Sequence, residues 1–330
     1  MSKRRLNQQQ QRRIDNRQQR SRDHVVADFQ LDDSAVRFDG TVIAHFGDQV
    51  EIIDSAGKIQ RCHLRANLEP LVVGDRAVIQ SDDSTAVVTA RQPRDSELIR
   101  PDNFGKLKPV AANIDRIGIV FAPYPEAHSN LIDRYLVAAE LQKITPFLVL
   151  NKTDLLDAIT QVEIEQLCKL YTEIGYTVIR CSATTEQGLE PLLNYLSGYT
   201  SILVGQSGVG KSSLLNQLQP QANSSVGALS QGADKGRHTT TTSRLYPLPS
   251  GGSLIDSPGI REFGLSHIQA RDVIDGYIDF DEYKCCKFRD CRHQSEPGCA
   301  LLAAEQRGDI DPRRLANYRQ IVATIETPAS

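Results

Sequence analysis

Residues 201–212 read SILVGQSGVGKS, an apolar run that ends in a glycine-rich turn. The turn from Gly205 to Ser212 matches the pattern G-x-x-x-x-G-K-[ST], and a helical pattern follows it. A strand, such a turn and a helix form a P-loop, whose backbone N–H groups curl around a phosphate. In that arrangement Lys211 offsets the charge of the β- and γ-phosphates, and the Ser212 hydroxyl binds Mg²⁺. The residues expected to bind a nucleotide here are Gly205, Gln206, Ser207, Gly208, Val209, Gly210, Lys211, Ser212 and Ser213.

Strand-like and helix-like stretches alternate around this turn, after a polar connector at 91–108. We expect strands at 116–121, 146–150, 177–180 and 201–204, and helices at 130–142, 164–174, 189–196 and 212–218. The alternation predicts a central α/β domain with a doubly wound, mainly parallel sheet, whose ligand crevice lies at the carboxyl ends of the strands.

Two segments after the P-loop are candidates for the Mg²⁺ and γ-phosphate contacts. Residues 254–259 read LIDSPG, in which Asp256 can hold the Mg²⁺ shell and the N–H of Gly259 can meet the γ-phosphate. Residues 232–243 read GADKGRHTTTTS, which predicts a polar loop that orders over the same groups. Thr240 and Thr241 are both candidates for the threonine that binds Mg²⁺.

A base-recognition motif follows the strand at 146–150, where residues 151–154 read NKTD and match N-K-x-D. Guanine presents two N–H donors on its Watson–Crick edge, and the carboxylate of Asp154 can accept both. Adenine would set a ring-nitrogen acceptor against that carboxylate, so the motif favours GTP over ATP. A Ser-Ala pair after the next strand supplies backbone N–H groups for guanine O6. The residues expected to bind the base are Asn151, Lys152, Thr153, Asp154, Ser182 and Ala183.

The order of these motifs along the chain is rotated. N-K-x-D and Ser-Ala precede the P-loop, whereas the ordinary GTPase order begins at the P-loop. The site needs only that its loops meet at one edge of the sheet, so joining the old termini and opening the chain elsewhere leaves the pocket intact. We therefore predict a GTPase domain with circularly permuted motifs.

Four of the seven cysteines lie between Cys285 and Cys299. Cys286, Cys291, His293 and Cys299 give the spacing C-x₄-C-x-H-x₅-C, a Cys₃His set that suits a closed tetrahedral zinc site. Cys285 competes with Cys286 as the first ligand, because adjacent side chains rarely bind one ion. The remaining three cysteines are scattered and are interpreted as small buried hydrophobic residues.

Two other segments precede the α/β region. Residues 1–23 carry eight Lys/Arg and two Asp, and this Gln- and Arg-rich tail is expected to be disordered and to contact nucleic-acid phosphates. Five short strand-like runs, at 36–38, 40–46, 49–53, 71–79 and 85–88, predict a small β-barrel. An OB-type barrel is the leading interpretation, and strand number alone leaves an SH3-like barrel open.

The chain of 330 residues, 40% of them hydrophobic, is long enough for several folded domains. Neither a run of 18 apolar residues nor an apolar N-terminal stretch is present, so we expect no membrane span and no secretory signal. A cytoplasmic monomer is the expectation. The expected bounds are 1–33 for the tail, 34–105 for the barrel, 106–267 for the permuted GTPase domain and 268–330 for a small helical zinc-binding domain.

Together, the permuted motifs, the barrel and the cysteine cluster resemble the family of small ribosomal subunit biogenesis GTPases over most of the chain. The resemblance implies GTP hydrolysis in late maturation of the small ribosomal subunit. It also implies that the barrel and zinc domains bind the subunit and its rRNA, and that the subunit stimulates hydrolysis, which is coupled to release.

The resemblance also implies a catalytic residue. Ile260 stands where many GTPases place a water-orienting Gln, so another group must orient the water. The family points to His238, whose imidazole can orient or deprotonate water near neutral pH. Lys211, Thr240 and Thr241 complete the expected catalytic set.

Two other functions remain open at this stage. A P-loop ATPase or kinase would share the phosphate turn but has no use for N-K-x-D. An RNA-binding protein built from the barrel and the zinc domain would use a bound nucleotide only as a conformational lock.

Overall fold

The computed structural model describes residues 36–82, 85–102, 105–219, 243–256, 265 and 267–326. The chain forms two compact units. The first runs up to Leu71 and includes Asp75–Pro93, and the second contains Val72–Gly74 and the chain from Arg94 onward. The predicted tail at 1–33 lies outside the described residues, and the predicted domain bounds stay a prediction.

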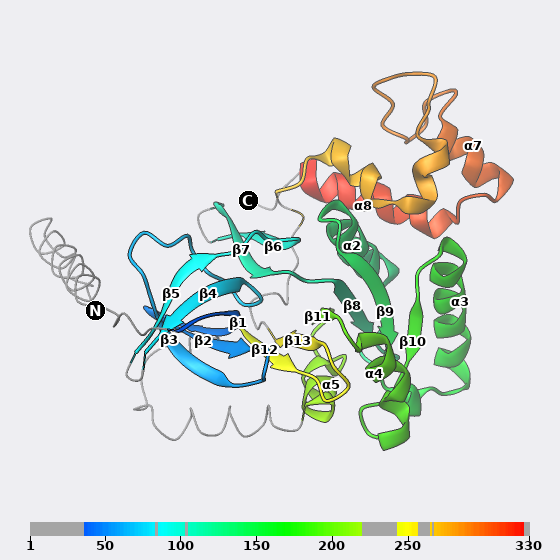
Figure 1. The fold of residues 1–330 in the computed structure, drawn as a ribbon. Helices are drawn as coiled ribbons and strands as arrows, with labels where there is room; N and C mark the ends of the chain where they lie inside the picture. Colours follow the sequence, from blue (N-terminus) through cyan, green and yellow to red (C-terminus); the bar gives the residue numbers. More distant parts are fainter. Residues whose placement is uncertain are drawn as a thin grey trace, which may run out of the picture. The chain divides into compact units, whose positions relative to one another are not determined.

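Five strands of the first unit close into a barrel (blue and cyan in Figure 1). They are β1 (Val36–Phe46), β2 (Gln49–Asp54), β3 (Ile59–Leu64), β4 (Arg76–Ser81) and β5 (Ala86–Arg91). The pairing runs β1–β2–β3–β5–β4 and returns to β1, and only β3 and β5 pair in parallel. This closed five-stranded order is that of an OB-type barrel rather than an SH3-like one. Its buried core consists of Val42, Val50, Ile52, Cys62, Leu71, Ala77, Ile79, Ala86 and Val88.

The prediction of five barrel strands has the right number but not the right set. The predicted strands at 36–38 and 40–46 are one strand, β1, which pairs with both β2 and β4. Gly40 looks like part of a turn, yet a Cβ there would lie 2.3 Å from Cγ2 of Ile52, so the glycine permits a close approach inside the barrel. Strand β3 is missing from the prediction because in IQRCHL only Cys62 is buried.

The second unit is organised around six strands. They are β8 (Arg116–Phe121), β9 (Thr145–Leu150), β10 (Val178–Arg180), β11 (Thr200–Val204), β12 (Arg244–Pro247) and β13 (Ser253–Asp256). Their spatial order is β10–β9–β8–β11–β13–β12, and all pair in parallel except β12. The chain adds β9 and β10 on one side of β8 and then places β11 on the other side. The strand order therefore reverses between β8 and β11, the position at which doubly wound folds bind ligands.

Helices cover both faces of these strands (green in Figure 1). They are α2 (Ser129–Leu141), α3 (Ala158–Ile174), α4 (Glu190–Leu196) and α5 (Lys211–Leu218), with short 3-10 turns η1 (Thr153–Leu155) and η2 (Glu186–Leu189). Val120 of β8 packs in one core with Leu192 of α4 and Leu214 of α5. Successive strand residues point to opposite faces, and the neighbouring Ile119 lines a small cavity together with Ile132 of α2.

Helix α3 and one hairpin differ from the prediction for this unit. Helix α3 begins well before the predicted residue 164, because Asp157 caps its first turn. The prediction missed this start because the apolar residues Ile159 and Val162 are exposed there and obscure the amphipathic pattern. A hairpin that was not predicted, β6 (Glu97–Pro101) and β7 (Leu107–Ala112), begins in the polar connector and extends past its end.

The C-terminal segment packs directly on α2 (orange and red beside α2 in Figure 1). It comprises η4 (Ala270–Gly276), η5 (Ile278–Tyr283), α7 (Ala300–Arg307) and α8 (Pro312–Glu326). Tyr277, Phe280 and Leu315 share a core with Val137 and Ala138 of α2. Among the helices of the described residues, none is both long and apolar enough to cross a membrane.

Candidate functional site

The glycine-rich turn connects β11 to α5 at the carboxyl edge of the sheet. Gly205 and Gly210 have φ of 138° and 97°, a region that favours glycine. A Cβ at Gly205 would lie 2.2 Å from the carbonyl oxygen of Val120, and one at Gly210 would lie 2.4 Å from Nδ2 of Asn151. These two glycines therefore allow the turn to lie directly against β8 and against the loop after β9.

The charged and hydroxyl groups predicted for the phosphate site lie at this same edge of the sheet. Nζ of Lys211 donates to the carbonyls of Gly205 and Gln206, each at 2.7 Å, so the ammonium group lies against the turn. Ser212 and Ser213 are exposed in the first turn of α5. Asp256, also exposed, ends β13, which pairs in parallel with β11. Gly259, His238, Thr240 and Thr241 lie outside the described residues.

Asn151 joins the loops that follow three strands. The side chain is buried, with 1% of the residue exposed. Its Nδ2 donates to the carbonyl of Val209 at 2.9 Å, and its Oδ1 accepts from the N–H of Ala183 at 3.3 Å. The loops after β9, β10 and β11 therefore meet at this amide.

Lys152 crosses from the N-K-x-D loop to the P-loop. Its Nζ donates to the carbonyl of Gly208 at 2.7 Å and to that of Tyr124 at 2.9 Å. Its backbone is left-handed, with φ of 60°, which a lysine adopts only where surrounding contacts impose it. These two bonds hold the lysine side chain between the two loops. The contact with Tyr124 was not predicted, because a backbone carbonyl 28 residues away leaves no signal in the sequence.

Asp154 presents an exposed carboxylate beside these loops. It accepts a hydrogen bond from the hydroxyl of Ser182, which is buried, and this bond lowers the pKa of the Asp154 carboxyl. The group is therefore ionised at neutral pH and acts as an acceptor. Oγ1 of Thr153 donates to the carbonyl of Cys181 at 3.1 Å, which ties the two loops together. The arrangement suits a ligand edge that offers two donors, as guanine does.

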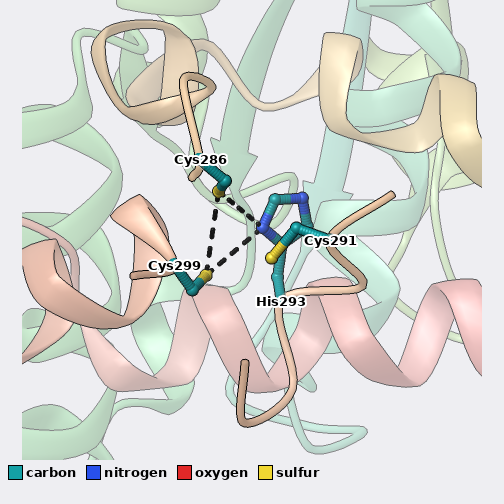
Figure 2. A group of neighbouring side chains, drawn as sticks. All are labelled: Cys286, Cys291, His293 and Cys299. Carbon is teal, nitrogen blue, oxygen red and sulfur yellow. Dashed lines mark hydrogen bonds between the residues drawn. The ribbon is translucent and has the colours of Figure 1, made fainter. Parts of the chain in front are cut away.

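A second group of side chains lies in the segment between η5 and α7. Figure 2 shows Cys286, Cys291, His293 and Cys299 converging on one point, and their ligand atoms all lie within 4.8 Å of one another. Cys285 is exposed and is not part of this group. His293 has a left-handed backbone, with φ of 59°, which aims its ring into the cluster.

The spacing of these atoms fits a tetrahedral metal ion. A tetrahedron with metal–sulfur bonds of about 2.3 Å has sulfur–sulfur edges of about 3.8 Å and nitrogen–sulfur edges of about 3.5 Å. The Sγ atoms of Cys286 and Cys299 lie 3.9 Å apart, and Nδ1 of His293 lies 3.5 and 3.4 Å from them. Three thiolates and an imidazole are soft or borderline ligands, so this cluster can hold a metal ion such as zinc.

The sheet and its loops define a class of protein. A P-loop lies at the point of strand reversal, the N-K-x-D loop is bonded both to it and to the Ser-Ala loop, and the chain reaches these motifs in rotated order. Together these features are those of a P-loop GTPase with circularly permuted motifs.

Comparisons with known proteins narrow this class. The profile described as RsgA GTPase matches residues 91–266. A Pseudomonas putida protein named small ribosomal subunit biogenesis GTPase RsgA is 49% identical, and the match covers 98% of each chain. A Pseudomonas aeruginosa protein of the same name is 50% identical over 98% of each chain.

Two solved structures are also similar. The crystal structure of YjeQ from Thermotoga maritima has a TM-score of 0.75 and 30% identity, covering 89% of this chain and 100% of that one. YloQ, titled a circularly permuted GTPase, has a TM-score of 0.72 and 28% identity, covering 89% of this chain and 98% of that one. The chain belongs to the RsgA GTPase family.

Proposed function

We propose that this chain hydrolyses GTP to GDP and phosphate during late maturation of the small ribosomal subunit. The observation that carries the proposal is the junction at which Asn151 and Lys152 bond the guanine-type loop to the P-loop. The name of the curated relatives, which match along 98% of the chain, supplies the small ribosomal subunit as the partner.

Each residue of the pocket has a proposed role. Asp154 accepts the two N–H donors of guanine, and the backbone N–H groups of Ser182 and Ala183 bind O6. Lys211 and the N–H groups of the P-loop hold the phosphates. Ser212 and Asp256 hold Mg²⁺, which would stabilise the charge that develops on the β- and γ-phosphates. His238 would orient the attacking water, with Thr240 or Thr241 completing the Mg²⁺ shell.

The proposed metal centre is structural. Cys286, Cys291, His293 and Cys299 would bind one Zn²⁺, and a set of four protein ligands leaves no open position for catalysis. The ion would cross-link loops that are otherwise short of secondary structure. We propose that this segment and the barrel contact rRNA and that the protein acts as a monomer in the cytoplasm, where its partner is assembled.

Base selectivity tests the pocket directly. Asp154→Asn replaces an acceptor with an amide whose N–H₂ can donate, so preference should move from guanine toward xanthine nucleotides. Titration with GDP and XDP in parallel measures this change. Unchanged guanine preference would reject the assignment of Asp154.

Turnover tests the function as a whole. GTP hydrolysis should rise when purified small subunits are added, and ATP should not replace GTP. His238→Ala should lower the stimulated rate while leaving GTP affinity near the wild-type value. If subunits bind without any change in turnover, the RNA-binding alternative would replace the enzyme.

A further inference from the structure

The start of α2 is held by one residue of the C-terminal helix. Asn317 of α8 is 8% exposed, and its side-chain amide donates to the hydroxyl of Ser129 at 3.1 Å and to the carboxylate of Asp133 at 2.8 Å. Its backbone carbonyl accepts from the side chain of Asn130 at 3.4 Å. A single residue of α8 thus bonds to three residues in the first half of α2.

A buried charge network fixes where Asn317 lies. Arg314, one turn earlier on α8, is fully buried, forms an ion pair with Asp133, and bonds both oxygens of Asp279 at 2.7 and 3.0 Å. Tyr171 of α3 donates to the same Asp133 carboxylate at 2.6 Å. Any slide of α8 along α2 would leave buried charges without partners, so the network holds the two helices in one register.

The start of α2 has no cap of its own. The residue before it, His128, makes no side-chain capping bond, and the first turn contains no acidic residue. Side chains of other helices contact this end instead: Asn317 donates to the Ser129 hydroxyl, and Tyr171 donates to the Ser129 carbonyl at 3.2 Å. Because an uncapped helix end frays, the position of this end depends on those helices.

The segment immediately before α2 supports the nucleotide loops. The carbonyl of Tyr124 accepts from Nζ of Lys152, and the Tyr124 hydroxyl donates to Asp157 at 3.0 Å. A Cβ on Gly208 would lie 3.5 Å from Cδ of the Pro125 ring, so this ring packs beside the P-loop. The Tyr124–Pro125 turn is therefore in contact with both the N-K-x-D loop and the P-loop, and only three residues separate Pro125 from Ser129.

We propose that Asn317 is a positioning residue for the guanine-nucleotide pocket. By fixing the start of α2, it fixes the Tyr124–Pro125 turn, and through that turn the positions of Lys152 and Gly208. The inference rests on the proposed function, because it concerns the same pocket. It adds a route by which the C-terminal segment governs nucleotide affinity. The metal cluster is joined to the same helix, because Arg319 of α8 donates to the carbonyl of His293 at 2.8 Å.

Nucleotide affinity measured on the full-length protein tests the inference. Asn317→Ala should weaken the binding of a fluorescent GDP analogue by about fivefold, since one hydrogen bond contributes on the order of 1 kcal/mol and 1.4 kcal/mol corresponds to tenfold. Gln320→Ala, exposed on the same helix, should bind as wild type does. A purely structural role would lower the melting temperature and leave affinity unchanged well below that temperature.

A second variant removes the hydrogen bond between Asn317 and Ser129 by changing Ser129 instead. Ser129→Ala should reproduce part of the loss of affinity, because Asn317→Ala also removes the bond to Asp133. The double variant should lose no more than Asn317→Ala alone, because the bond to Ser129 is shared. Ser129→Ala also decides the matter if Asn317→Ala does not fold. If the folded variants bind GDP as tightly as the wild-type protein does, this inference is wrong and the proposed function is unaffected. If the wild-type protein itself binds no guanine nucleotide, the proposed function is wrong.

Discussion

Gly210 shows how one missing side chain lets two loops of the pocket meet. A Cβ at this position would lie 2.4 Å from Nδ2 of Asn151, the atom that donates to Val209. Gly210→Ala should therefore displace Asn151 and weaken guanine-nucleotide binding about tenfold, because losing a buried hydrogen bond costs on the order of 1–3 kcal/mol. Isothermal titration with GDP measures the effect.

A matched control separates this clash from backbone strain. Gly175, the C-cap of α3, also has a left-handed backbone, with φ of 112°, but a Cβ there would meet nothing within 4 Å. Gly175→Ala should lower stability and leave GDP affinity unchanged. Equal losses of affinity in both variants would contradict the steric explanation.

Helix α3 owes its early start to Asp157. The carboxylate accepts from the N–H groups of Ile159 and Thr160 at 3.0 and 2.8 Å, and the hydrogen bond from Thr160 is the main cause that lowers the pKa of Asp157. Asp157→Ala should accelerate amide hydrogen exchange at these two positions and lower the melting temperature. Asp157→Asn, which retains a capping oxygen, should change neither at neutral pH.

The same cap makes a prediction about pH. Because the folded-state pKa of Asp157 is lowered, its contribution is fully present above the ordinary Asp value of about 3.9 and is lost as pH falls through the lowered value. The gap in melting temperature between wild type and Asp157→Ala should therefore narrow in acid. The gap between Asp157→Asn and Asp157→Ala should persist there, and a parallel narrowing of both gaps would argue against the carboxylate as the cause.

Arg314 connects helix α8 to helix α2 within the second unit. Its side chain is 1% exposed and pairs with Asp133 on α2 and Asp279 on η5. Arg314→Ala should cost about 3–5 kcal/mol in the free energy of unfolding, because it leaves buried carboxylates without a cation. Arg313→Ala removes a partly exposed pair with Asp311 and should cost at most about 1 kcal/mol in the same urea titration. Similar losses in both variants would show that the buried network contributes no special stability.

The cysteine cluster should also stabilise the whole second unit, because Cys299 shares a core with Val137 of α2. We expect one zinc ion per chain by atomic absorption, and a chelator should lower the melting temperature. Cys291→Ser should abolish zinc binding, whereas Cys285→Ser, which changes the exposed neighbouring thiol, should retain it. Zinc loss in Cys285→Ser would contradict the ligand set.

Prediction from sequence succeeded for the alternating strands and helices of the second unit, because their apolar periodicity is a local property. It failed for β3, whose single buried residue leaves no clear alternation, and for the start of α3, where exposed Ile159 and Val162 obscure the pattern. It placed Cys286 in the metal cluster but left Cys285 open as a competitor for the same position. Only the folded loop separates them, because adjacent side chains point in different directions.

The sequence by itself determined the chemistry of this protein: the phosphate turn from Gly205 to Ser212, the guanine-type motif at 151–154, and their rotated order. Each lies in a few contiguous residues, so residue type and spacing are enough to define it. Tertiary structure alone decided how the pocket is held. The carbonyl of Tyr124 and the pair of Arg314 with Asp133, 181 residues apart, have no local signature, because such contacts arise only when distant elements pack together.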